Sequence, residues 1–228
     1  MPRTKLENRV LPGYTRGEEI FNMVSHIVGG GLGVVVFLAC IIVAAWYQNI
    51  WGMVSGGVYG FTVILLFTMS SIYHGLPEGF AKKVFQVLDH CTIFLLIAGT
   101  YTPILLGRFR VVYPAAAWTN FAIVWGLALL GIILNAIDLK RFAVFSMVCY
   151  LGMGWMVVFS FGKVGEVLGS RFLLFMLLGG IFYTVGAVCY VIGARKKTRY
   201  IHSVFHIFVD LAALAHCWGV VAYIMPVS

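Results

Sequence analysis

The chain has 228 residues, of which 61% are hydrophobic and only 11% are charged, and its mean hydropathy is +0.97. A water-soluble domain carries roughly a quarter of its residues as charges. The composition therefore excludes a water-soluble globular protein and indicates an integral membrane protein. The formal net charge of +8 does not point to a nucleic-acid partner, because the 16 Lys and Arg residues form short clusters between apolar runs, a pattern that membrane topology explains.

Apolar stretches dominate the chain, and seven of them reach the roughly 20 residues that a membrane-spanning helix needs. A polar tail over residues 1–20 precedes them and lacks the apolar core of a cleaved signal, so we expect the first helix to direct insertion. The pattern predicts an all-α, seven-transmembrane helix bundle that forms a single domain over 21–228, located as a multi-pass protein in the cell membrane. In chain order the predicted spans cover 24–47, 50–74, 84–106, 111–135, 141–161, 172–193 and 201–225.

The basic residues predict which way the bundle faces. Loops rich in Lys and Arg stay in the cytoplasm, and 12 of the 16 basic residues fall on the side of the N-terminal tail. We therefore expect a cytoplasmic N-terminus and an extracytoplasmic C-terminus. The 12 are Arg3, Lys5, Arg9, Arg16, Lys82, Lys83, Lys140, Arg141, Arg195, Lys196, Lys197 and Arg199.

Ionisable side chains within or at the ends of the spans are functional candidates, because each costs a few kcal/mol in a bilayer. His202 and His206 stand four residues apart, which places both imidazoles on one face of a helix. In the predicted topology His74 and Asp89 lie at the same depth, at the cytoplasmic ends of the second and third spans. The full candidate set is His26, His74, Asp89, His90, His202, His206, Asp210 and His216.

Three histidines on two helices, completed by a water molecule, are typical of an open catalytic zinc site. The sequence thus predicts Zn²⁺ held by His74, His202 and His206. Ser70 lies one helical turn before His74, and Asp89 enters from the third span, so we expect both to act on the metal-bound water, Asp89 by accepting a proton. These two residues are the predicted catalytic pair.

The motifs Ser70-x-x-x-His74, Asp89 within LDHCTIFLLIAGTYTP, and HSVFH beginning at His202 resemble the hemolysin III family, which is related to the progestin and adipoQ receptors. The resemblance covers nearly the whole chain. It implies that the three histidines hold zinc, as their counterparts do in the adiponectin receptors, and that the counterpart of Asp89 contacts the zinc-bound water. A similarity to alkaline ceramidases within this wider group implies an amide lipid as substrate.

The other ionisable groups leave alternatives open. Asp210 lies one turn past His206, so it is either a fourth metal ligand or a protonated or hydrogen-bonded carboxyl group. His90 points about 100° away from Asp89, toward a loop or the headgroups. We expect His26 and His216 to form hydrogen bonds between helices, although His26 is also a candidate for contact with the metal ligands.

Three functions follow in order of preference. The first is a zinc-dependent hydrolase that acts on an amide or ester bond of a membrane lipid and influences membrane homeostasis. The second is a receptor-like sensor or regulator of membrane state with a structural zinc, in which Asp210 closes the site and a membrane lipid is the effector. A pore-forming cytolysin ranks third, because secreted pore formers begin as soluble proteins and this chain shows neither a signal nor a soluble domain.

Overall fold

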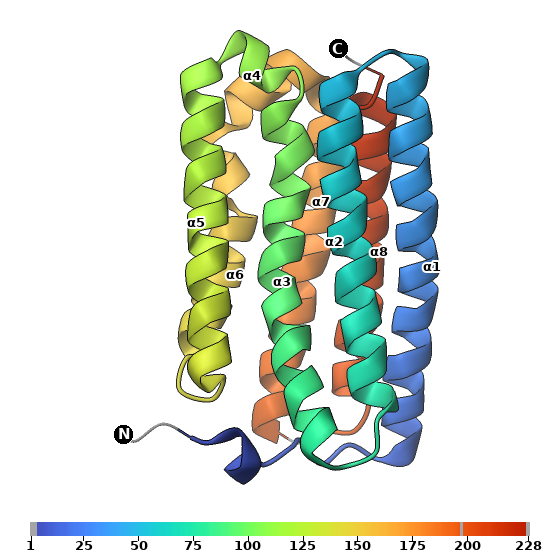
Figure 1. The fold of residues 1–228 in the computed structure, drawn as a ribbon, viewed down its shortest axis with the longest axis vertical. Coiled ribbons are helices and arrows are strands. Elements are labelled where there is room, and N and C mark those ends of the chain that lie inside the picture. The colour runs from blue at the N-terminus through green and yellow to red at the C-terminus, as the bar shows by residue number, and fades with distance from the viewer. Residues whose placement is uncertain (1–3, 197, 227–228) are drawn as a thin grey trace.

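The computed structural model describes residues 4–196 and 198–226, which form an elongated bundle of nearly parallel helices (Figure 1). Arg3 and Lys197, two of the residues used to predict orientation, lie outside this range. The described elements are η1 (Leu6–Asn8), α1 (Arg16–Trp46), α2 (Ile50–Gly75), α3 (Phe80–Leu106), α4 (Phe109–Val112), α5 (Pro114–Asp138), α6 (Ala143–Gly154), η2 (Met156–Ser160), α7 (Phe161–Lys196) and α8 (Ile201–Tyr223).

Six helical stretches among the described residues are long and apolar enough to cross a membrane, which confirms a helical membrane bundle. The seven predicted spans become six here because Ala143–Ala194 counts as one stretch of 52 residues. That stretch contains α6, η2 and most of α7, and its backbone leaves helical geometry at Gly169, where φ is 83°. Glycine adopts such a positive φ at little cost. Two spans within this stretch, over 141–161 and 172–193, stay a prediction.

Two helix boundaries differ from the predicted ones for local reasons. α1 begins at Arg16 rather than at 24, because Thr15 and Glu18 form a reciprocal capping box at its N-terminus. The predicted fourth span, over 111–135, is divided into α4 and α5. Pro114 begins α5, at a position where its missing N–H leaves no hydrogen bond unmade.

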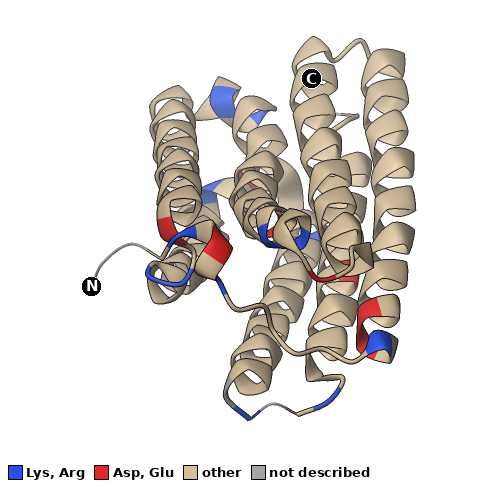
Figure 2. Cartoon of the chain, turned by 60° about the horizontal axis from the view of Figure 1, so that its bottom comes forward, with Lys and Arg blue, Asp and Glu red and all other residues tan. Residues whose placement is uncertain are grey.

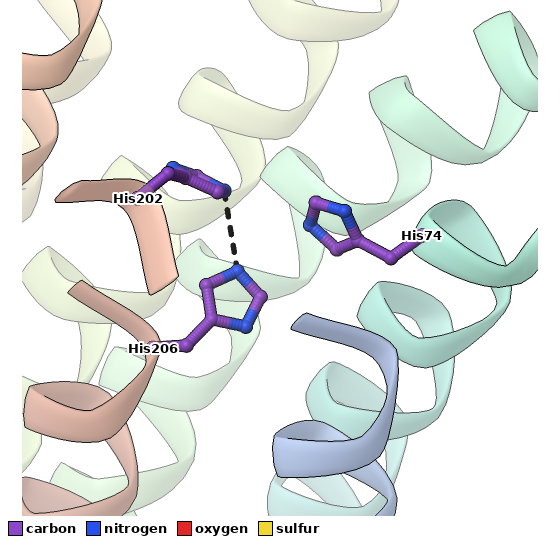
Figure 3. Close-up of side chains that lie close together, drawn as sticks. All are labelled: His74, His202 and His206. Carbon is purple, nitrogen blue, oxygen red and sulfur yellow. Dashed lines mark hydrogen bonds between the residues drawn. The ribbon is translucent and has the colours of Figure 1, made fainter. Parts of the chain in front are cut away.

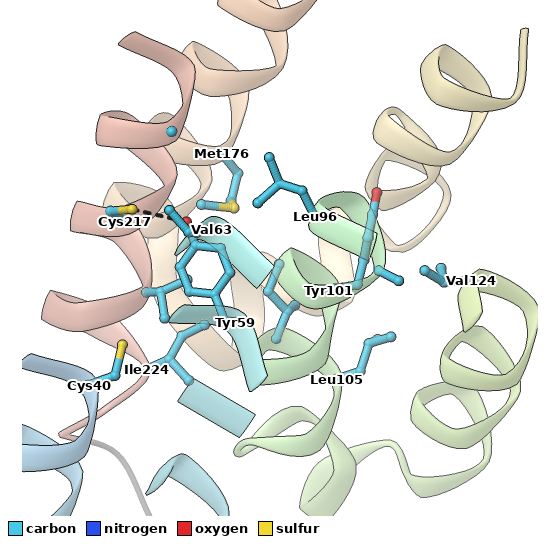
Figure 4. Packing of buried hydrophobic residues seen from close by; sticks show 14 of the residues in the cluster. Cys40, Tyr59, Val63, Leu96, Tyr101, Leu105, Val124, Met176, Cys217 and Ile224 are labelled. Carbon is cyan, nitrogen blue, oxygen red and sulfur yellow. Dashed lines mark hydrogen bonds between the residues drawn. The ribbon is translucent and has the colours of Figure 1, made fainter. Parts of the chain in front are cut away.

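The core of the bundle lies where α2, α3 and α8 face one another (Figure 4). Tyr59 of α2 is fully buried, and its hydroxyl lies 3.2 Å from the thiol of Cys217 on α8. Leu96 and Tyr101 extend the same core along α3. Glycines let the helices approach closely, since a Cβ on Gly60 of α2 would lie 2.6 Å from the backbone of Phe37 on α1.

The two ends of the bundle differ in the chain segments they carry. η1 and the first turn of α8 lie at the lower end, and the last turn of α8 lies at the upper end (Figure 1). Several Lys and Arg residues mark the N-terminal segment and the loops of the lower end (Figure 2). The cytoplasmic placement of this end stays a prediction.

Candidate metal centre

The first turns of α8 are tied to the start of α1. The backbone N–H of Tyr200, which precedes α8 and has a left-handed φ of 58°, donates to Oε1 of Glu18 at 2.6 Å. One turn farther, the hydroxyl of Ser203 donates to Oδ1 of Asn22 at 2.7 Å. These bonds fix the rotation of α8, which turns His202 and His206 toward α1 and α2.

His74 lies in the last turn of α2, where the helix carbonyls lack partners within the helix. The buried ammonium of Lys82 donates to three of them, the carbonyls of Tyr73 and Leu76 at 2.9 Å each and that of His74 at 3.4 Å. It also forms an ion pair with Oε1 of Glu19 at 3.0 Å. Lys82 therefore holds the end of α2 and a carboxylate of α1 in one place.

The three predicted metal ligands meet at this end of the bundle (Figure 3). One ring nitrogen from each of His74, His202 and His206 lies within 4.8 Å of the other two. Nε2 of His206 lies 3.2 Å from Nε2 of His202. His74 and His206 are 2% and 1% exposed, so water does not solvate these rings.

Neighbouring groups decide which nitrogens carry lone pairs. Nδ1 of His74 lies 2.6 Å from Oε2 of Glu19, so this nitrogen carries the proton and donates it to the carboxylate. Nε2 of His74 then presents a lone pair, and it is buried without a hydrogen-bond partner among the described residues. The hydroxyl of Ser25 donates to the carbonyl of Asn22 at 3.0 Å and can accept from Nδ1 of His206 at 3.5 Å.

These contacts fit a metal ion. With the protons on the Nδ1 atoms, the Nε2 lone pairs of His74 and His206 point into one space. Two lone pairs that face each other repel unless a cation lies between them. Neutral imidazole nitrogens are the ligands that zinc prefers, and a histidine that donates its other N–H to a carboxylate is the usual outer contact of such ligands. The residues present could therefore hold one divalent cation through His74, His202 and His206.

Ser70 and Asp89 lie outside the group of three histidines. Ser70 is buried on α2, one turn before His74, as its spacing predicts. In the described part of the chain, no hydrogen bond joins Ser70 or Asp89 to the three histidines. Oδ2 of Asp89 instead lies 3.6 Å from Nδ1 of His90. The catalytic roles of Ser70 and Asp89 stay predictions.

The remaining candidates separate into different surroundings. His90 donates from Nδ1 to the carbonyl of Gln86 at 2.9 Å and is not part of the metal group. His216 donates to the carbonyl of Met176 at 3.1 Å, which confirms the predicted bond between helices. Asp210 is not in the metal group, and its Oδ1 has no hydrogen-bond partner among the residues described.

The predicted hydrogen bond of His26 was wrong. Both ring nitrogens of His26 lack partners within the described ranges. The ring instead stacks on His206, with centroids 3.8 Å apart and planes 24° apart. The structure has the other possibility for His26, contact with a candidate metal ligand.

Sequence reasoning missed three contributors to the site. Glu18 and Glu19 are adjacent in the sequence, and the capping box uses only Glu18. The second carboxylate, which the cap does not need, was the signal that could have identified Glu19. Lys82, counted as a loop cation, is buried at the start of α3. Tyr14 stacks on His202 with a centroid distance of 4.8 Å, and burial raises its pKa, so the phenol stays neutral.

Known proteins resemble this chain over most of its length. The chain is 34% identical to "Hemolysin-3 homolog" of Bacillus subtilis (strain 168), over 94% of this chain and 98% of that protein. It is also 34% identical to "Hemolysin-3" of Bacillus cereus, over 92% and 94% of the two chains. Human "Monocyte to macrophage differentiation factor" is 24% identical, over 78% of this chain and 73% of the relative.

No solved structure matches the chain at a significant level. The family model described as "Haemolysin-III related" matches residues 14–217, from Tyr14 to Cys217, and so includes all three histidines of the candidate metal centre. This match and the apolar helices identify the protein as a multi-pass membrane protein. The chain belongs to the haemolysin-III-related family.

Proposed function

We propose that the protein is a zinc-dependent hydrolase that cleaves an amide or ester bond of a membrane lipid. The observation that carries this proposal is the convergence of three histidine nitrogens, with Nε2 of His74 buried and unpaired among the described residues. Three histidines leave a fourth coordination position for water, which is typical of catalytic rather than structural zinc.

Each residue has a defined part in this reaction. A bound zinc ion would supply Lewis acidity and lower the pKa of a water molecule toward about 7. Glu19 keeps the proton of His74 on Nδ1, which leaves Nε2 free to coordinate. Asp89 accepts a proton as the nucleophile forms, and Ser70 orients the reacting group from α2.

The position of the centre supports a lipid as the substrate. The histidines lie at the ends of apolar helices, and His74 and His206 are almost fully buried while His202 is partly exposed, so membrane amphiphiles reach them more easily than water-soluble molecules do. Because of the resemblance to alkaline ceramidases, we propose amide lipids first.

A zinc-pinned regulator of membrane state is the second candidate. The observation in its favour is that the ligands come from two helices, His74 from α2 and the other two from α8, so a bound ion would hold these helices together. A closed site would need Asp210 as a fourth ligand, and the position of Asp210 outside the group supports the enzyme instead.

A cytolysin, which the name of the Bacillus cereus relative suggests for that protein, ranks third. The described helices include six that are long and apolar enough to span a membrane, and they commit this chain to the membrane in which it is made.

The experiment that tests the hydrolase compares Asp89→Ala with the wild type, in detergent, for lipid hydrolysis and for bound zinc. Loss of a general base lowers turnover by about 10²- to 10⁴-fold, and we expect zinc content to stay unchanged. Amide and ester lipids are both supplied as substrates. If Asp89→Ala loses zinc as completely as a histidine variant, Asp89 is a ligand and not a base. If the zinc-loaded wild type cleaves neither lipid and zinc removal only lowers the melting temperature, the regulator is correct.

A further inference from the structure

Residues 4–15 form a strap that crosses the lower end of the bundle before α1 begins (Figure 2). At the start of the strap, the backbone N–H of Thr4 donates to Oδ2 of Asp138, the last residue of α5, at 2.7 Å. Farther along, Nζ of Lys83 on α3 donates to the carbonyl of Glu7. The other end continues directly into α1. The strap is therefore attached to the ends of three helices, α5, α3 and α1.

The strap carries an aromatic ring to the candidate metal centre. The ring of Tyr14 stacks on that of His202, with centroids 4.8 Å apart and planes 20° apart. Its centroid lies 5.8 Å from that of His74. With this ring in place, His74 is only 2% exposed. Because Tyr14 contacts candidate ligands from both α2 and α8, it covers the space between them at the lower end of the bundle.

Aromatic rings on other sides of the centre belong to helices. The rings of Tyr190 on α7 and Phe205 on α8 have centroids 5.8 Å and 5.2 Å from that of His202. Both are held by helices that pack within the bundle. Tyr14 differs, because it precedes α1 and lies in a segment without helical hydrogen bonds. It is the part of this aromatic wall that can move without moving a helix.

The stretch of the strap before Tyr14 is lightly packed. Val10 is 89% exposed, and a Cβ on Gly13 would meet no atom within 4 Å. The backbone N–H of Tyr14 returns to the carbonyl of Pro12 at 3.1 Å, a bond within the strap itself. Few buried contacts are typical of segments that open locally at low cost in free energy. Residues 10–14 can therefore swing away while the strap keeps its outer attachments.

We propose that the strap is a gate between the metal centre and the water at the lower end of the bundle, and that the ring of Tyr14 closes it. The closed ring shields His74 and His202 from charged solutes, and the open ring admits a metal ion or a chelator. Opening precedes both entry and exit, so both rates scale with the open fraction. A metal ion that binds the open and closed states equally does not shift this fraction, and its equilibrium affinity stays the same. This inference rests on the metal centre of the proposed function but not on hydrolysis.

The test measures how fast zinc enters and leaves the full-length protein in detergent. An excess of a charged chelator reports release, and mixing metal-free protein with zinc reports binding. Tyr14→Ala removes the closing ring and should raise both rates by roughly two- to tenfold, which is the factor by which a stacked aromatic contact favours the closed state. The zinc dissociation constant should change by less than about twofold, because the gate is not a ligand.

Matched variants separate the gate from general effects on the strap. Tyr14→Phe keeps the ring and should show the rates of the wild type. Val10→Ala changes a side chain that is 89% exposed on the same strap, and it should also leave both rates unchanged. Lys83→Met releases the attachment at Glu7 without touching the ring. It should raise both rates by a smaller factor than Tyr14→Ala, and it provides the second variant if Tyr14→Ala fails to fold.

The possible failures are distinguishable. Equal rates in Tyr14→Ala, Lys83→Met and wild type, all loaded with zinc, would overturn the gate and keep the metal centre. Faster release with a weaker affinity and an unchanged binding rate would also overturn the gate, because Tyr14 would then stabilise a ligand instead of covering it. Absence of zinc from the wild type would overturn the metal centre and the gate together.

Discussion

Two clusters of charged and aromatic residues lie in different parts of the bundle and differ in their access to solvent. Near the metal centre, Lys82 is buried and pairs with Glu19, which in turn bonds His74. At the start of α5 and α7, the hydroxyl of Tyr113 donates to an exposed Glu166 at 2.6 Å, and Lys163 lies over the Tyr113 ring. In the first cluster Lys82 and His74 have almost no solvent to replace a lost partner, so matched substitutions in the two clusters should have very different effects.

The largest expected effect on stability is that of Lys82→Met. Removing the buried ammonium leaves the partly buried Glu19 and the carbonyls of Tyr73 and Leu76 without their donor, and breaking a buried pair costs about 3 to 5 kcal/mol. We expect the free energy of unfolding in detergent to fall by about 3 kcal/mol.

Lys163→Met is the matched control in the exposed cluster. It should change the free energy of unfolding by no more than about 0.5 kcal/mol. Equal losses in the two variants would remove the distinction between the clusters.

Glu19→Gln should weaken metal binding by about 10- to 100-fold, as is typical when the outer partner of a histidine ligand is changed. The amide oxygen still accepts the His74 proton, but the negative charge that makes the imidazole a better ligand is lost. A zinc titration with a competing chelator measures the affinity. Glu166→Gln, the same change in the exposed cluster, should leave the affinity unaltered, and a matching loss there would indicate a general effect of charge.

The smallest expected effect concerns Tyr14, whose ring covers His202. Tyr14→Ala removes an aromatic contact worth about 0.5 to 1.5 kcal/mol. Amide hydrogen exchange across residues 4–14 should then rise, because the N-terminal segment loses a contact with α8. Tyr14→Phe keeps the stacked ring and should exchange like the wild type. Faster exchange in the phenylalanine variant would show that the hydroxyl, and not the ring, holds the segment.

The sequence predicted the helices and the meeting of the three histidines because both follow from spacing along the chain. Four-residue spacing brings His202 and His206 to one face of α8, and the order of the spans brings His74 to the same end. Composition alone could not reveal the break at Gly169, since a single glycine inside an apolar run also occurs in continuous helices.

The outer contacts of the site depend on how distant helices pack, and so the sequence did not predict them. Glu19 and His74 are 55 residues apart, and no local pattern joins them. Lys82 stands beside Lys83, and both were interpreted as loop cations. Only Lys83 extends to the N-terminal segment, where its Nζ donates to the carbonyl of Glu7. His26 was expected to find a hydrogen-bond partner, but the partner of its ring is another histidine.

Metal content is the most direct test of the candidate centre. Wild-type protein and His206→Ala are purified in the same detergent and analysed for zinc per chain, with His216→Ala as the control, because His216 bonds a backbone carbonyl away from the centre. We expect close to one zinc per chain in the wild type and the control, and almost none in His206→Ala. Equal zinc in all three proteins would contradict a metal site formed by His74, His202 and His206.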